Sequence, residues 1–132
     1  MTAVGVDLGT QYLSGKQFMH RELMHALVDG LYEPVARVEA ARGRLEITCL
    51  EKDGRMLIQL VNVGGSHGNP NIATDDYIPP VLDVFLSLKL PQTPVKLLLQ
   101  PEGRKLKARE LDGRLWVEIE RIDIHSVLEI QY

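Results

Sequence analysis

Apolar and polar residues alternate through much of the chain from Arg44 onward, in short segments that turn signals separate. The pairs Asp53-Gly54 and Asp112-Gly113 each supply the two positive-φ residues that a tight hairpin needs. Residues 101–103, a Pro-Glu-Gly sequence, mark a third turn. Strands joined by such turns run antiparallel, so the pattern predicts an antiparallel meander.

The alternation and the turns together define eight strands. These strands span residues 35–41, 44–51, 55–63, 81–90, 94–100, 105–111, 114–120 and 126–132. Eight short strands in about 100 residues favour two packed sheets over one open sheet. The sequence therefore predicts a mainly β fold, an antiparallel two-sheet β-sandwich with one N-terminal amphipathic helix.

The phase of the alternation indicates which face of a strand is buried. The apolar residues Leu82, Val84, Leu86, Leu88 and Leu90 alternate with Asp83, Phe85, Ser87 and Lys89. Residues 115–119 repeat the pattern, with Trp116 and Glu118 in the phase opposite to the apolar residues. Residues 56–61 are instead apolar on both faces, so we expect this strand to be central, with the helix on its outer side.

One segment has the spacing of a helix. Residues 16–32 carry apolar side chains three and four positions apart, including Met19, Leu23, Leu27 and Leu31. We expect this stripe to bury against the sheet or a partner chain, and the helix to end at the glycine and proline of positions 30 and 34. The apolar residues 3–6 predict a short strand, which an irregular link joins to the helix.

A strand and one helix before a β region are an unusual start for a self-contained sandwich. We therefore divide the chain in two. Residues 1–34 resemble the end of a preceding α/β domain or a helix that caps the sheet, and residues 35–132 form the β-sandwich domain.

Composition narrows the possible partners. The 132 residues carry a net charge of −3 with both signs interspersed, which argues against nucleic-acid binding, because that needs clustered positive charge. Nothing approaches the roughly 20 apolar residues of a membrane span, and no secretory pattern opens the sequence, so we expect a cytoplasmic location without a membrane partner. The single cysteine, Cys49, follows Leu45 and Ile47 in an apolar phase, which predicts a buried, inert thiol.

Residues 5–10, with the sequence Gly-Val-Asp-Leu-Gly-Thr, resemble the first phosphate motif of sugar kinases and other actin-like ATPases. In those proteins the aspartate, here Asp7, holds a metal-bound water. The motif there turns back into a second strand, whereas here a helix follows, and 132 residues cannot hold the two domains of that fold. We do not expect a nucleotide site, a metal site or a cofactor.

The histidines do not form a metal site either. His20 and His25 are five positions apart, which places them about 140° apart around a helix axis, too far to share one ion. His125 precedes the last strand with no nucleophile beside it. We expect it to be a packed, hydrogen-bonded structural residue.

The long loop from Asn62 to Pro80 is the main candidate for binding chemistry. Its polar candidates are His67, Asn69, Asn71, Asp75, Asp76 and Tyr77. Such residues can hydrogen-bond to sugar hydroxyls, and the paired carboxylates of Asp75 and Asp76 can bind calcium. The favoured alternative is a sheet-to-sheet crossover that its three prolines stiffen. A glycosidase site is less favoured, because nothing places a second acid about 5–10 Å from Asp75 or Asp76.

The strand and loop residues also resemble a known family. The similar segments are Gly54–Asn62, Ser66–Pro70, Ile78–Pro80, Leu88–Pro91, Leu99–Pro101, Leu111–Arg114 and Ile122–Ser126. Together they are similar to the C-terminal β-sandwich of bacterial multidomain glycoside hydrolases related to α-L-fucosidases and β-galactosidases. There the sandwich follows a catalytic TIM barrel and an amidotransferase-like domain that resembles the β-galactosidase trimerisation domain. Residues 4–33 match the closing strand and helix of that domain, and Gln59 stands where the family often has His.

The resemblance implies that this chain carries no catalytic residue, because the family's catalytic acids lie in the barrel. We expect a non-catalytic accessory or interaction domain, whose partner is the upstream barrel or α/β domain, or a second copy through the 16–32 helix. Two alternatives stay open. A carbohydrate-binding module using the 62–80 loop needs exposed aromatic residues such as Trp116 or Tyr77, and a small glycosidase-like enzyme has only His67, Asp75 and Asp76 as clustered candidates.

Overall fold

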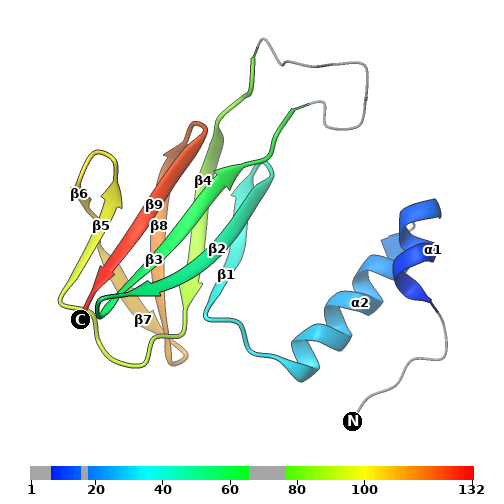
Figure 1. The fold of residues 1–132 in the computed structure, drawn as a ribbon, viewed down its shortest axis with the longest axis horizontal. Helices are drawn as coiled ribbons and strands as arrows, with labels where there is room; N and C mark the ends of the chain where they lie inside the picture. The colour runs from blue at the N-terminus through cyan, green and yellow to red at the C-terminus, as the bar shows by residue number, and fades with distance from the viewer. Residues whose placement is uncertain (1–6, 16–17, 66–76) are drawn as a thin grey trace. The chain divides into compact units, whose positions relative to one another are not determined.

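A computed structural model describes residues 7–15, 18–65 and 77–132 of the chain (Figure 1). The chain forms two compact units, one up to Pro34 and one from Val35 onward. Among these described residues, the first unit contains two helices and the second contains nine strands.

Helix α1 spans Leu8–Gly15 and was missed by the sequence pattern, which predicted an irregular link there. Asp7 caps this helix. Its carboxylate accepts a hydrogen bond from the Thr10 backbone N–H at 3.0 Å, and its carbonyl accepts one from the Gln11 N–H at 3.1 Å. The first bond satisfies an amide at the start of the helix that has no backbone partner, and the second is the first regular bond of the helix. The predicted strand at residues 3–6 lies outside the described residues.

Helix α2 spans Phe18–Leu31 and confirms the predicted helix. Gly30 lies within it, so the helix ends one residue later than the glycine signal indicated. None of its 14 residues is buried. The exposed fractions of Met19, Leu23 and Leu31 are 79%, 45% and 66%, so the other described residues of the first unit do not bury the apolar stripe.

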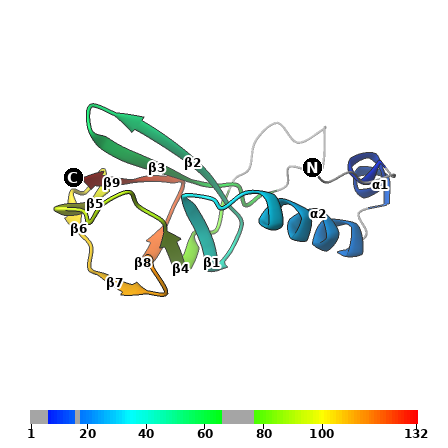
Figure 2. The same cartoon turned by 90° about the horizontal axis from the view of Figure 1, so that it is seen from below.

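The second unit is an antiparallel sandwich of two sheets, which confirms the predicted fold class. The strands are β1 (Ala36–Arg42), β2 (Leu45–Lys52), β3 (Arg55–Asn62), β4 (Val81–Leu88), β5 (Lys96–Gln100), β6 (Arg104–Lys105), β7 (Ala108–Leu111), β8 (Arg114–Ile122) and β9 (His125–Gln131). One sheet has the order β1-β4-β8-β7 and the other the order β2-β3-β9-β5-β6. Figure 2 shows the two sheets as separate layers. As expected, β3 is an interior strand, because β2 and β9 flank it.

Tight turns connect the hairpins where the sequence placed them. Asp53-Gly54 joins β2 to β3 with φ values of 52° and 69°, and Asp112-Gly113 joins β7 to β8 with 52° and 71°. Both pairs adopt the left-handed conformation that a two-residue hairpin loop requires. Gly43 serves a different connection, from β1 in one sheet to β2 in the other, where a side chain would clash with Val81.

The segment 105–111 is not one strand, and the strands do not form a simple meander. Residues 104–105 belong to β6 in the five-stranded sheet, whereas residues 108–111 belong to β7 in the four-stranded sheet. The chain crosses between the layers at Leu106, which bonds to the Leu97 carbonyl and packs against the core. The turn chemistry is local, so it identified the hairpins but not the sheet that each strand joins.

Side chains from both sheets fill one apolar core. The fully buried members are Ile58, Leu60, Val81, Val84, Leu86, Leu88, Leu99, Val117, Ile119, Ile122, Leu128 and Ile130. The predicted alternation of β4 is wrong at one end, where Val81 is buried and Leu82 is not. Asp83 has a φ of 50°, which shifts the alternation by one residue. The partner strand shifts in step, because Val81 pairs with the equally buried Ile122.

Cys49 is exposed, so the prediction of a buried thiol is wrong. It lies on β2, which is an edge strand of the five-stranded sheet. Leu45 and Ile47 in the same phase pack against the core, but from Thr48 to Lys52 every residue of the strand is exposed. Partial desolvation raises the pKa of the Cys49 thiol, which keeps it in the less reactive neutral form.

Candidate functional site

The long loop leaves the sandwich after β3 and returns to it before β4. Five of its six candidate residues, His67, Asn69, Asn71, Asp75 and Asp76, lie outside the described residues. Tyr77 is described and is 74% exposed. The loop's described ends, residues 62–65 and 77–80, therefore define where the candidate site attaches to the fold.

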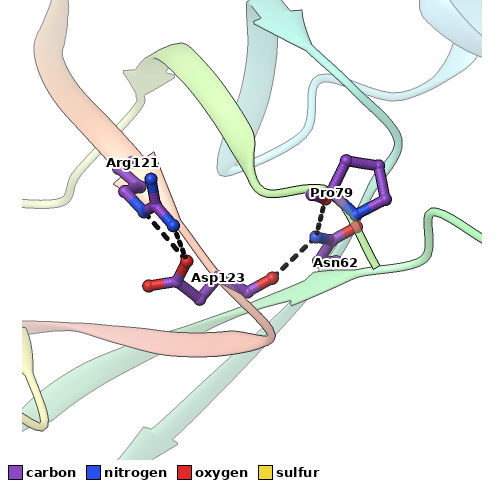
Figure 3. Close-up of polar contacts among 4 residues, drawn as sticks. All are labelled: Asn62, Pro79, Arg121 and Asp123. Carbon is purple, nitrogen blue, oxygen red and sulfur yellow. Dashed lines mark hydrogen bonds and ion pairs between the residues drawn. The ribbon is translucent and has the colours of Figure 1, made fainter. Parts of the chain in front are cut away.

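Asn62 holds the two ends of this loop together (Figure 3). Its side-chain amide donates to the Pro79 carbonyl at 2.8 Å and to the Asp123 carbonyl at 2.6 Å. Its side-chain oxygen accepts from the Gly64 backbone N–H at 2.8 Å. Only 6% of the residue is exposed. One buried amide thus joins the start of the loop, its end and the β8–β9 turn.

Sequence reasoning did not single out Asn62 for this role, although a signal was present. Met56, Ile58 and Leu60 occupy the core-facing phase of β3, and Asn62 is next in that phase. A polar side chain at a core-facing position needs hydrogen-bond partners, because an unsatisfied buried amide is costly. An asparagine that ends an apolar phase, just before a long loop, is therefore a candidate loop clamp.

The β8–β9 turn brings charged side chains to the same end of the sandwich. Arg121 Nε lies 2.9 Å from Asp123 Oδ1, and Figure 3 shows the two side chains facing each other. The hydrogen bond and the charge of Asp123 raise the pKa of Arg121, and Tyr77 contributes in the same direction.

A hollow of about 560 Å³ opens between the β5–β6 turn and the β8–β9 turn. Its charged lining residues are Glu102, Arg104, Glu120, Arg121 and Asp123, and His125 lies beside them. Pro101 and Ile124 add apolar surface. Such a mixture can hydrogen-bond a polar ligand, but Asp123 is already held by Arg121 and by the contact of its backbone carbonyl with Asn62.

His125 is exposed at the rim of this hollow and starts β9, opposite Val61. The prediction of a packed structural histidine is therefore wrong. His20 and His25 lie on α2, as the helix prediction placed them. Among residues 7–15, 18–65 and 77–132, no group of three or more His, Cys, Asp or Glu side chains is arranged to hold a metal ion.

Among the described residues, two carboxyl groups, those of Asp7 and Glu129, have shifted pKa values, and both are lowered. The Thr10 amide lowers the pKa of Asp7. Hydrogen bonds from Gln100 and Gln131, assisted by Arg55, lower the pKa of Glu129 on the outer face of the five-stranded sheet. A lowered pKa keeps a carboxylate ionised, which is opposite to what a general acid needs.

The described part of the chain contains no helix that is both long enough and apolar enough to span a membrane.

Among solved structures, the chain is similar to the α-L-fucosidase isoenzyme 2 of Paenibacillus thiaminolyticus, with a TM-score of 0.77 and 15% sequence identity. The match covers 95% of this chain but 20% of that chain, so this chain spans about a fifth of the fucosidase's length. At this identity the likeness shows the fold alone. No protein-family model matches the sequence, and no curated protein matches it.

Proposed function

We propose that this chain is a non-catalytic accessory domain of a glycoside hydrolase-like protein. The observation that carries the proposal is the extent of the structural match. It covers 95% of the chain, so it includes helical residues as well as the sandwich, and corresponds to 20% of a fucosidase chain. An accessory domain is a piece of this size within a larger enzyme.

The chemistry of the described carboxylates supports a non-catalytic role. Glycoside hydrolysis uses two carboxyl groups, one of which must keep its proton near neutral pH. Asp123 in the large hollow is engaged by Arg121, and Glu129 has a lowered pKa. The lowered pKa makes Glu129 unsuited to donate a proton to a leaving group.

The partner in this proposal is an upstream barrel or α/β domain, or a second copy of the chain. Helix α2 supports it, because Met19, Leu23 and Leu31 form exposed apolar surface that a neighbour can cover. A cytoplasmic location belongs to the same proposal. It is supported by Cys49, an exposed free thiol of the kind that a reducing compartment keeps reduced.

A glycosidase assay tests the non-catalytic role. We expect the purified chain to release no nitrophenol from a panel of nitrophenyl α- and β-glycosides. Turnover that disappears in Asp75→Asn or Asp76→Asn would overturn the proposal and favour the small-enzyme alternative. Asp83→Asn is the matched control, because Asp83 belongs to β4, outside the loop sequence, and pairs with Arg42 at 2.9 Å.

A further inference from the structure

The outer face of the four-stranded sheet carries two aromatic side chains. They occupy solvent-facing positions, where polar residues are more usual. Phe85 lies on β4 and Trp116 on β8, and both are partly exposed. The residues next to them along the strands, Val84, Leu86 and Val117, are in the opposite phase and are buried. The two rings therefore belong to the surface of the sandwich.

The strand register places the rings next to each other. Trp116 pairs with Ser87 on β4, and Phe85 pairs with Glu118 on β8. Phe85 and Trp116 are thus diagonal neighbours across two strands, a separation that aromatic side chains bridge. Arg109 on β7 pairs with Trp116 from the other side. The two rings form one surface, with a guanidinium at its edge.

This surface is hollowed. A depression of about 260 Å³ has Phe85 and Trp116 among its lining residues, together with Lys107, Arg109 and Glu118. Among the described residues, no hydrogen bond or ion pair engages the side chains of Lys107, Arg109 and Glu118. Their donors and acceptors are thus available to a ligand that rests on the rings.

The opposite edge of the aromatic surface is closed by bonds within the protein. Arg114 Nε donates to Ser87 Oγ at 3.0 Å, and its terminal nitrogen donates to the Ser87 carbonyl at 3.1 Å. Ser87 Oγ also donates to Glu39. Glu39, Ser87 and Arg114 on the β1 side are therefore engaged with one another.

We propose that this face binds a pyranose ring of an oligosaccharide. A sugar ring has an apolar face of C–H groups, which the negative face of an aromatic ring attracts, and an edge of hydroxyls that charged side chains can bond. Phe85 and Trp116 supply the stacking surface, and Lys107, Arg109 and Glu118 supply the bonds. The choice of a sugar over a peptide rests on the proposed glycoside-hydrolase context, whereas the site itself rests on the geometry.

The chain contains a single tryptophan, so fluorescence reports on this site directly. We expect titration with L-fucose, D-galactose and 2′-fucosyllactose to shift or quench the emission of Trp116 saturably, for at least one of them. Amide shifts in NMR should be confined to residues 85, 107–109 and 116–118.

Two substitutions locate the binding. Phe85→Ala and Arg109→Ala both keep the fluorophore, and each should weaken the response by roughly tenfold. Tyr77→Ala is the matched control, because it removes an exposed aromatic residue from the long loop and should leave the titration unchanged. Unaltered amide spectra of the buried strands show that each variant is folded.

Three outcomes would overturn the inference. These are amide shifts confined to the loop ends at 62–65 and 77–80, a response to a proline-rich peptide but to none of the sugars, and no response to any probe. The nitrophenyl glycoside assay reads the proposed function separately, because it tests turnover and does not depend on Trp116. If Trp116 fluorescence does not respond to the sugars and no glycoside is turned over, the sugar site is rejected and the accessory role is retained.

Discussion

The helical unit and the sandwich treat apolar residues in opposite ways. In the sandwich, leucines, isoleucines and valines of both sheets are fully buried in one core, Leu128 and Ile58 among them. In α2, Leu23 and Met19 remain 45% and 79% exposed, and no residue of the helix is buried. The sandwich thus buries a large apolar core, although Leu50 and Leu111 at its edges are 45% exposed. The helix buries none of its apolar stripe, which a partner can cover.

The contrast between the two units shows that a pattern of apolar residues has different consequences in a strand and in a helix. A strand that alternates apolar and polar residues finds the other half of its core within this chain. An apolar stripe on a helix indicates that another surface covers it, but it does not indicate which surface. The stability of the chain should therefore depend on the sandwich, and its association with other surfaces should depend on the helix.

The largest effect expected is that of Leu128→Ala, in the centre of the sandwich. Leu128 has no exposed surface, so truncation leaves a cavity and should lower the free energy of unfolding by about 2–5 kcal/mol. Leu23→Ala is the matched change in α2 and should alter it by less than about 0.5 kcal/mol. Urea denaturation followed by circular dichroism measures both.

If Leu128→Ala does not fold, Ile58→Val makes a smaller cavity at another fully buried position and should cost about 0.5–1.5 kcal/mol. Equal losses of unfolding free energy in Leu23→Ala and in the core variants would contradict the difference between the helix and the sandwich. They would mean that the helix is as deeply packed as the strands.

A second, smaller effect concerns the polar clamp of the sandwich. Asn62→Ala removes the donors to Pro79 and Asp123 and leaves their carbonyls to find other partners. We expect a loss of about 1–3 kcal/mol, because buried polar groups lose their partners. Gln59→Ala is the control on the same strand, at a position of intermediate exposure, and should cost less.

Amide hydrogen exchange gives this prediction a second measurement. Residues 63–64 and 78 should exchange faster in Asn62→Ala than in the parent chain, because the loop ends are no longer joined. Unchanged exchange at these positions would show that the prolines, and not Asn62, fix the loop.

The hairpins of the sandwich are predictable from local pattern, and the error at helix α1 in the first unit has a local cause. The hairpins at Asp53-Gly54 and Asp112-Gly113 follow from turn chemistry alone. Helix α1 was missed because its eight residues carry no amphipathic stripe long enough to recognise. Its only strong signal is Asp7, whose capping role was masked by the resemblance of residues 5–10 to a phosphate motif.

Features that depend on how strands assemble were not predictable. Nothing in residues 105–111 says that β6 and β7 join different sheets, because the neighbour of each strand is distant in sequence. The exposure of Cys49 depends on β2 being an edge strand. Alternation correctly put Phe85 and Trp116 on the solvent side of their strands. That they lie together follows only from the β4–β8 register.

A third prediction concerns how the stability of the sandwich depends on pH. Gln100, Gln131 and Arg55 hold the pKa of Glu129 below its ordinary value of 4.5. Because the folded-state pKa is the lower one, this carboxylate stabilises the sandwich above pH 4.5. That stabilisation is lost as the pH falls through the folded-state value. Thermal unfolding between pH 3 and 6 should show this fall, and Glu129→Gln should flatten it.

Glu118→Gln is the control for the pH experiment, because Glu118 is exposed on the other sheet. It should leave the slope below pH 4.5 as it is in the parent chain. A slope that survives in Glu129→Gln would assign the acid sensitivity to a group outside this cluster.

A charge placed on the apolar stripe of α2 should have the smallest effect on stability. It is also the most direct test of whether the stripe binds a partner. If a second copy covers the stripe, sedimentation velocity of the parent chain should show association that rises with concentration. Leu23→Glu should return the protein to a monomer without changing its unfolding midpoint, because the site is 45% exposed in the single chain. His25→Glu adds the same charge away from the stripe and should leave association intact. A parent chain that stays monomeric at every concentration would exclude the second copy and leave an upstream domain as the proposed cover.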